Sequence, residues 1–376
     1  MSTVAITSTR HSLDDAFAQV MELAGLAGIV GRGKTVLVKP NQHGGNGYTS
    51  PLVIAAAARW AFSRGAGEVW VGDGPFWSMD DAMPYFRESG LLGACEETGA
   101  KPLNFHQGEY RVIEPGVPEL PPTIGFSEYL YQADVVINLP LMKTHFNTLV
   151  TLGTKNLKGC LRPIDKKTFH DIELNEALAE VNRLLKPVIT ATVMDATTAM
   201  EGMGPAAATP VQMGLLIASS DVVAADSVGC HLMGIDPTQA RLIRFCTERG
   251  VGVMDLTKMN LVGERIEDHK RRFRLPFEAL AEDFPELRLV TEHACSGCML
   301  NLFRAMEIAR HHGQEIKYDT LVIGPGVTSE GEVLLVGQCT KAGWEGSPYV
   351  RGCPPRVEAI REGLTGIGTR DDVPQS

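Results

Sequence analysis

Short apolar runs rich in valine and isoleucine alternate with amphipathic segments from the N-terminus onward. This alternation is typical of parallel strands joined by crossover helices. It predicts strands at 4–9, 36–41, 68–75 and 134–139. Ser12 is placed to cap a first helix that runs to about residue 26, and a second helix starts at Ser50 and Pro51. The pattern therefore predicts an α/β protein with a Rossmann-like parallel sheet region.

The middle of the chain is less regular. A helix is expected at about 80–97, and the proline-rich segment 112–125 is expected to be an extended excursion or lid. One further strand is expected to end at Asp195 and to be followed by a glycine-rich loop. Another strand is expected at 212–221. The charged segment 261–283 reads as a link to a smaller domain. We expect domains at 1–283 and 284–376, the second being a small α/β unit with strands at 287–291, 319–324 and 332–339.

Polar residues fall where the expected strands end. Lys39 and Asn41 close the second strand, and Asp73 closes the third between two glycines. Ligands of open α/β sheets bind outside the carboxyl ends of the strands, so these side chains are candidates for substrate binding. A solvated lysine and a simple turn remain open alternatives for Lys39 and Asp73. The chain has no G-x-G-x-x-G after the first strand and no G-x-x-x-x-G-K-[ST], so neither nucleotide-binding motif is supported.

A dense basic stretch follows the strand at 134–139. Cations next to an amide and hydroxyls are what an anionic ligand such as a carboxylate, phosphate or sulfonate requires. We expect Lys143, His145 and Lys155 to be catalytic, and Thr144, Asn156 and Lys158 to bind substrate. The roles of Lys166 and His170, further along, stay open. Asp195 and Glu201 are also expected to bind substrate and, with Asp226, to orient the cations.

Four cysteines near the C-terminus predict a metal site. Cys295 and Cys298 form a C-x-x-C pair at the start of an apolar helical run, and Cys339 and Cys353 follow singly. Pro354 comes directly after Cys353, and Cys-Pro often ends an iron–sulfur ligand set. We expect a [4Fe–4S] cluster with three or four of these ligands. Zinc is the alternative, although zinc ribbons normally supply two C-x-x-C pairs. Cys95, Cys160, Cys230 and Cys246 are scattered and read as buried apolar residues.

Charge and composition exclude several classes of protein. The net charge of −10 argues against nucleic acid as a partner, because a phosphate backbone requires a basic face. We find neither a signal sequence nor a run long enough to span a membrane, which predicts a cytoplasmic protein. In a reducing compartment, clustered cysteines indicate metal binding or catalysis more than disulfides.

Several motifs in order resemble a known family. These are LVKPN, GDG, VINLPLMKTH, TKNLKG, the D-A-x-x-A-M-E-G-x-G-P segment at 195–205, and ASSDVVAADSVGCHLMGIDP. Together they resemble domain of unknown function 362 over about residues 33 to 240. The resemblance implies an association with iron–sulfur clusters but no particular substrate. Members commonly carry a ferredoxin-type cysteine run, which this chain lacks, so the resemblance does not place the cluster.

The favoured function is an anaerobic redox enzyme that passes electrons through the cluster to a small anionic substrate. His145 or Lys143 would be the proton donor. A redox partner protein and a homodimer are both compatible with this interpretation. A non-redox lyase or isomerase that uses an open iron as a Lewis acid, and a non-enzymatic electron or cluster carrier, are the alternatives.

Overall fold

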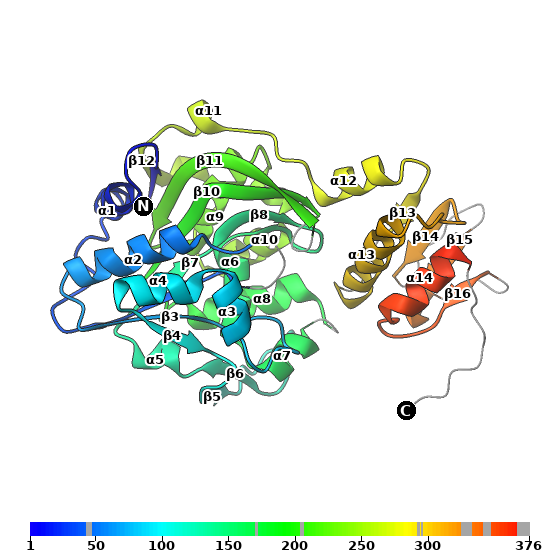
Figure 1. Ribbon diagram of the computed structural model, residues 1–376, viewed down its shortest axis with the longest axis horizontal. Coiled ribbons are helices and arrows are strands. Elements are labelled where there is room, and N and C mark those ends of the chain that lie inside the picture. The colour runs from blue at the N-terminus through cyan, green and yellow to red at the C-terminus, as the bar shows by residue number, and fades with distance from the viewer. Residues whose placement is uncertain are drawn as a thin grey trace. The chain divides into compact units, whose positions relative to one another are not determined.

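The computed structural model describes residues 1–42, 47–169, 172–203, 207–291, 294, 296–324, 333–340 and 347–366 (Figure 1). The chain divides into two compact units. Met1–Phe169 and Asn175–Phe277 form the larger unit, and the chain from Glu278 onward forms most of the smaller one. Within the described residues, no helix has the length and apolar character needed to cross a membrane.

The larger unit is built on one mixed sheet with the strand order β12-β1-β11-β10-β7-β2-β3-β4. Along this path the pairings are parallel except those of β11, which runs antiparallel to both β1 and β10. Strand β8 pairs with β10 and with β9 beside this path. The predicted α/β class is therefore confirmed. The bounds are β1 (Ser2–Ser8), β2 (Thr35–Pro40), β3 (Glu68–Asp73), β4 (Lys101–Asn104), β7 (Val135–Leu139), β8 (Leu141–His145), β9 (Leu149–Thr151), β10 (Ala191–Met203), β11 (Ala207–Ser219) and β12 (Met259–Gly263).

Helices cover both faces of this sheet. Phe17 and Trp60, from α1 and α2, share one apolar cluster with Val36 and Val38 of β2. These two valines are separated by one residue and therefore point to the same face. Gly229 of α9 packs against Met194, whose strand neighbour Val193 belongs to the first cluster, so α9 covers the opposite face. The helices are α1 (Leu13–Leu23), α2 (Pro51–Ser63), α3 (Met83–Glu88), α4 (Leu91–Thr98), α5 (Tyr129–Gln132), α6 (Gly153–Asn156), α7 (Pro163–Thr168), α8 (Leu174–Leu185), α9 (Val222–Leu232), α10 (Arg241–Glu248) and α11 (Ile266–His269).

The local expectations had mixed outcomes. Ser12 caps α1 as predicted, since its Oγ accepts a hydrogen bond from Asp15 N at 3.2 Å, although the helix already ends at Leu23. The single helix at 80–97 is wrong, because Gly90 has φ +80° and separates α3 from α4. Part of the proline-rich excursion is a two-stranded antiparallel sheet of β5 (Tyr110–Ile113) and β6 (Ile124–Ser127).

The expected loop after Asp195 is also wrong. Strand β10 continues from Ala191 to Met203 because it pairs with β11 along its length, with an irregularity between Ala196 and Thr198. The expected link at 261–283 is partly wrong as well, since β12 belongs to the large sheet through its pairing with β1.

The smaller unit has its own sheet, whose four strands are parallel and lie in sequence order. Val290, Val322, Val333 and Leu335 form an apolar cluster within it. Helices α13 and α14 pack against each other (Figure 1). The bounds are α12 (Pro276–Asp283), β13 (Arg288–Val290), α13 (Ser296–His311), β14 (Thr320–Ile323), β15 (Val333–Val336), β16 (Tyr349–Val350) and α14 (Val357–Thr365).

Candidate functional site

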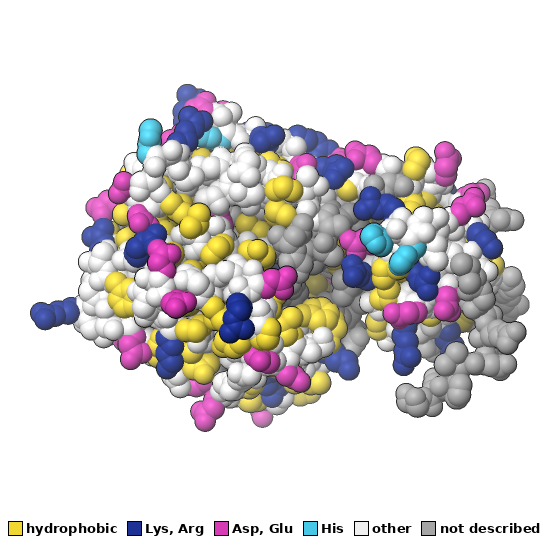
Figure 2. All heavy atoms as spheres, viewed as in Figure 1, with side chains coloured by type: hydrophobic (Ala, Val, Ile, Leu, Met, Phe, Trp, Pro, Cys, Tyr) yellow, Lys and Arg dark blue, Asp and Glu magenta, His cyan; other side chains and the backbone are white. Residues whose placement is uncertain are grey.

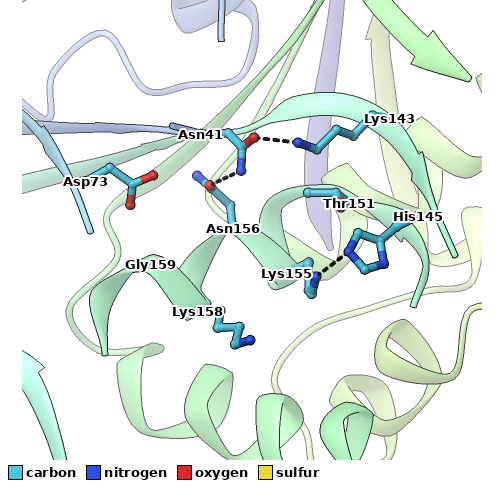
Figure 3. Close-up of a pocket in the computed structure, with 9 residues that line it drawn as sticks. All are labelled: Asn41, Asp73, Lys143, His145, Thr151, Lys155, Asn156, Lys158 and Gly159. Atoms are coloured by element: carbon cyan, nitrogen blue, oxygen red, sulfur yellow. Dashed lines mark hydrogen bonds between the residues drawn. The ribbon is translucent and has the colours of Figure 1, made fainter. Parts of the chain in front are cut away.

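A small pocket in the larger unit gathers most of the predicted site residues (Figure 3). The space between its lining atoms is about 350 Å³, a volume that includes open solvent. The lining residues are Asn41, Asp73, Lys143, His145, Thr151, Lys155, Asn156, Lys158 and Gly159. Seven of these nine residues were predicted from the sequence to be catalytic or to bind substrate, and the other two are Thr151 and Gly159.

Neighbouring parallel strands supply one side of the pocket. Lys39 lies in β2 opposite Asn138 of β7, Asn41 follows β2 directly, and Asp73 ends β3. The carboxyl ends of parallel strands meet at one edge of a sheet, which is where such folds bind ligands. Sheet register therefore explains why residues that are far apart in sequence meet here.

Strand β8 and the short helix α6 supply the other side. Lys143 and His145 lie in β8 itself, whereas the sequence placed them after a strand. Lys155 and Asn156 lie in α6 and Lys158 in the 3-10 turn η1 (Leu157–Cys160) that follows. All of these side chains are buried.

A buried aspartate fixes the start of α6. Asp226 accepts hydrogen bonds from Gly153 N at 2.6 Å, Thr154 N at 2.8 Å and Thr154 Oγ1 at 2.7 Å. Gly153 must be small, because an added Cβ would lie 2.9 Å from Asp226 Oδ1. Burial raises the pKa of Asp226 to about 7, while these three donors favour its ionised form. Asp226 thus positions Lys155 and Asn156 through the backbone of their helix.

Lys39 and Asp73 form a buried ion pair at the base of the pocket. Lys39 Nζ lies 2.7 Å from Asp73 Oδ1, and the lysine is fully buried. Asp73 also accepts from Gln42 N and Gly74 N, each at 2.8 Å. Gly159 lies so close to this pair that an added Cβ would overlap Asp73 Oδ1. The positive charge of Lys39 is therefore already matched within the protein.

A chain of amides orients Lys143. Its Nζ donates to Asn41 Oδ1 at 2.8 Å and to Gly47 O at 2.7 Å. Asn41 Nδ2 donates to Asn156 Oδ1 at 3.1 Å, and Asn156 Nδ2 donates to Asn138 Oδ1 at 2.8 Å. Figure 3 shows the first two asparagines linked in this way beside Lys143. Each amide has a donor and an acceptor role, so the network specifies one orientation of every side chain.

Lys155 and His145 face each other in the pocket (Figure 3). Lys155 Nζ lies 3.2 Å from His145 Nε2. The other ring nitrogen, Nδ1, accepts from the backbone amides of Asn147 at 3.1 Å and Thr148 at 3.4 Å.

Burial weakens the charge of the pocket lysines. It lowers the pKa of Lys155 to about 7, and burial together with the charge on Lys155 lowers the pKa of Lys143 to about 7. It also lowers the pKa of Lys158 well below its usual value. The carboxylate among the lining residues, Asp73, is paired with Lys39. Lys143 and Lys155 are thus buried in a pocket whose lining carboxylate, among the described residues, is paired with another lysine, which is the environment expected of an anion-binding site.

Three predicted substrate-binding residues bind the backbone and do not line this pocket. Thr144 Oγ1 donates to Gly202 O at 2.9 Å. Asp195 accepts from Ser50 N at 2.8 Å and from Thr197, and Glu201 accepts from Arg274 N at 2.9 Å. The expectation that Asp195 and Glu201 orient the pocket cations is therefore corrected: both lie in β10, where their carboxylates accept hydrogen bonds from backbone amides.

Sequence reasoning missed two lining residues, Thr151 and Gly159. The glycine of the T-K-N-L-K-G motif was a usable signal, because a glycine among lysines often marks a close approach of the backbone. Lys166, left open from the sequence, lies nearby and donates to Gly74 O at 2.6 Å and to His106 Nε2 at 2.8 Å. It holds the segment after β3 in place. His170 lies outside the described residues.

The smaller unit brings three of the four predicted cysteine ligands toward one edge of its sheet. Val336 of β15 pairs with Val350 of β16, and Cys339 and Cys353 each lie three residues beyond. Gln338 N donates to Gly352 O at 2.8 Å, which ties the two segments together. Cys298 lies in the first turn of α13, and Asn301 of this helix donates to Pro355 O at 2.8 Å.

Two of these sulfurs lie beside the same glycine. A Cβ added to Gly337 would lie 3.2 Å from Cys298 Sγ and 4.0 Å from Cys339 Sγ, so both sulfurs flank this one glycine. A helix N-terminus also favours negative charge, as thiolate ligands and their cluster would bring. Cys295 lies outside the described residues. Cys95, Cys160, Cys230 and Cys246 are buried, and burial raises the pKa of each thiol, which makes all four poor ligands.

Several known proteins are similar to parts of this chain. A thylakoid-associated protein of Synechocystis is 32% identical over 227 residues, which cover 57% of this chain and 68% of that protein. A crystal structure of a Thermotoga maritima protein aligns with a TM-score of 0.40 at 15% identity, over 60% of this chain and 58% of the other. The family described as domain of unknown function (DUF362) matches residues 36–231, a range that contains every pocket-lining residue and agrees with the resemblance expected from the motifs. The chain belongs to the DUF362 family.

Proposed function

We propose that this protein is an enzyme that binds a small anionic substrate in the lysine pocket, and that its smaller unit binds a [4Fe–4S] cluster. The observation that carries the proposal is the burial of Lys143 and Lys155 around one cavity whose lining carboxylate, Asp73, is paired with Lys39. Burying a lysine charge is costly, so two buried lysines in one place favour a ligand whose negative charge would stabilise their charged form.

The pocket residues have separate tasks in this proposal. Lys143, oriented by Asn41 and Gly47, binds the anion and is placed to give a proton to it. Asn156 and Asn41 fix the geometry, and the Lys39–Asp73 pair anchors the strand ends beneath. Burial excludes water and strengthens each charge-assisted hydrogen bond.

The cysteine cluster supports a redox reaction as the reaction class. Cys298, Cys339 and Cys353, with Cys295, would hold the cluster. When bound, a [4Fe–4S] cluster supplies single electrons. We accordingly propose a cytoplasmic oxidoreductase that works under anaerobic conditions and receives electrons from a partner protein.

Calorimetry with acetate and with inorganic phosphate tests the anion pocket. The wild-type protein should bind at least one of them near neutral pH. Lys143→Met should weaken this binding by about tenfold to a hundredfold, because a charge-assisted hydrogen bond contributes about 1.5–3 kcal/mol. Lys167→Met is the matched control, since Lys167 is exposed. Equal binding by both variants would count against the pocket.

Metal analysis after anaerobic purification tests the cluster. Roughly four irons per chain are expected. Cys298→Ser and Cys339→Ser should lower the iron content, whereas Cys95→Ser should not, because Cys95 is buried within α4. A colourless protein that contains one zinc would contradict the proposal.

A further inference from the structure

The hydrogen bonds of His145 determine where a neutral ring carries its proton. Nδ1 accepts from the backbone amides of Asn147 and Thr148, at 3.1 and 3.4 Å. A ring nitrogen that accepts a hydrogen bond carries no proton, so the proton of the neutral imidazole lies on Nε2. This Nε2 is the atom that faces Lys155 Nζ, 3.2 Å away.

A proton on Nε2 requires Lys155 to be a neutral amine. An ammonium group has three donors and no lone pair, so it cannot accept from Nε2–H. The amine has a lone pair and accepts this bond. The surroundings favour the same state, because Lys155 is buried and, in the described part of the chain, its Nζ forms no ion pair with a carboxylate. Burial lowers the pKa of Lys155 to about 7.

The other lysines of the site have different partners. Lys143 Nζ donates to two oxygens, Asn41 Oδ1 and Gly47 O, which only accept and so favour the ammonium form. Lys39 Nζ is paired with Asp73. In one pocket, the hydrogen bonds therefore favour the ammonium form of Lys143 and require the amine form of Lys155.

We propose that Lys155 is a nucleophile that forms a reversible imine with a small oxo acid, whose carboxylate is bound by Lys143. A buried, neutral lysine next to a second cationic group is the arrangement that activates amines toward carbonyl carbons. The amine of Lys155 needs a carbonyl carbon to attack, and the cation of Lys143 needs a carboxylate to bind. These two requirements together define the substrate class. This inference rests on the proposed anion pocket.

Imine formation joins Lys155 Nζ to the carbonyl carbon and releases the carbonyl oxygen as water. The lone pair of Nζ forms a C–N bond while the carbonyl π bond breaks and its electrons move to oxygen. The nitrogen loses a proton and the oxygen is protonated. Departure of this oxygen as water leaves a protonated imine, and the whole step takes up one proton. His145 Nε2 lies beside Nζ and is the group placed to exchange a proton with it.

Reductive trapping in the full-length protein tests the inference. The protein is incubated with pyruvate near neutral pH, reduced with borohydride, and examined by intact mass and peptide mapping. One reduced adduct on Lys155 is expected in the wild type, and none on this peptide in Lys155→Met. Lys167→Met, which changes an exposed lysine, should be labelled like the wild type. Mapping in the wild type locates the adduct even if a variant folds poorly.

Lactate, which has the carboxylate but no carbonyl group, separates the two proposals. If lactate binds by calorimetry and protects Lys155 from trapping by pyruvate, both proposals are supported. If lactate binds but pyruvate leaves no adduct on Lys155, the imine is wrong and the anion pocket stands. If neither acid binds and no adduct forms, both are wrong. Labelling spread over surface lysines, and unchanged in Lys155→Met, would also overturn the inference.

Discussion

At the residue scale, the lowered pKa values of the pocket lysines couple anion binding to pH. Lys143 and Lys155 have pKa values of about 7 in the free protein because they are buried. A bound anion favours their charged form and raises these pKa values, so binding takes up protons when the pH is near or above 7. Affinity is therefore expected to be greatest below pH 7 and to fall as the pH rises.

Calorimetry of phosphate or acetate in buffers with different ionisation enthalpies measures this coupling. Proton uptake near pH 7.5 is expected in the wild type and should be smaller in Lys143→Met. An affinity that rises steadily between pH 6 and pH 9 would contradict the assignment of these lysines to the site.

The same shifts predict a pH-dependent gain in stability. The unfolded chain keeps its lysines protonated up to the usual pKa of 10.5, whereas folding lowers the pKa of Lys155 to about 7. Between these values the unfolded state binds more protons, so this lysine makes the free energy of unfolding increase with pH. Below pH 7, Lys155 is charged in the folded state, so the free energy of unfolding is reduced by the full cost of burying this charge.

Lys155→Met should remove this penalty and stabilise the protein at pH 6.5 by on the order of 1 kcal/mol. At pH 9 the difference from the wild type should be smaller. Urea denaturation at the two pH values measures it, and Lys167→Met, at an exposed position, should show no such pattern. If Lys155→Met is less stable than the wild type at pH 6.5, burial of the Lys155 charge does not destabilise the folded protein.

At the element scale, the short helix α6 depends on a partner outside itself. Four residues cannot form a stable helix alone, and Asp226 of α9 supplies acceptors for the first amides of α6. Asp226→Asn replaces one acceptor oxygen with a donor and so leaves a buried amide unpaired. We expect a loss of about 1–3 kcal/mol in the free energy of unfolding, together with weaker anion binding.

Asp255→Asn is the matched control for this prediction. Asp255 also accepts from a backbone amide and a threonine hydroxyl, those of Thr257, but it lies on the surface. Its replacement should change stability by less than about 1 kcal/mol and leave binding intact. Equal effects of the two substitutions would show that Asp226 has no special role in placing Lys155 and Asn156.

The elements also show what the sequence could and could not predict. The strands β2 and β3 and the polar residues at their ends followed from local apolar runs, so Lys39, Asn41 and Asp73 could be placed at a sheet edge in advance. Strand β10 could not be predicted to its full length, because its pairing with β11 overrides the glycine at 202. For the same reason Asp195 and Glu201 were expected in the pocket, although pairing places them inside the sheet. The ring orientation of His145 depends on backbone amides that no sequence pattern reveals.

At the scale of the whole molecule, the pocket lysines are hidden within an acidic protein. The net charge is −10, and on the face shown in Figure 2 acidic and basic side chains are interspersed without one continuous basic patch. A net negative charge does not steer anions toward the protein over long range, so recognition depends on contacts inside the pocket. Such a site favours small anions that can enter over extended polyanions such as nucleic acids.

The two compact units predict two separable unfolding events. Each has a sheet and an apolar cluster of its own, as with Val36 and Phe17 in the larger unit and Val322 and Leu335 in the smaller. A ligand stabilises only the unit whose native state binds it. Iron bound by the cysteines should raise the transition temperature of the smaller unit alone, and an anion in the lysine pocket should raise that of the larger unit alone.

Calorimetric scans with and without anaerobic iron removal measure this difference. Iron removal and Cys339→Ser should both lower the transition temperature of the smaller unit. Phosphate or acetate should raise the transition temperature of the larger unit in the wild type but not in Lys143→Met. Tryptophan fluorescence helps to assign the transitions, because three of the four tryptophans, Trp60, Trp70 and Trp77, belong to the larger unit, so most of the signal should follow its unfolding. A single transition that iron and anion shift together would show that the units unfold as one, since binding energy at either site would then stabilise the whole chain.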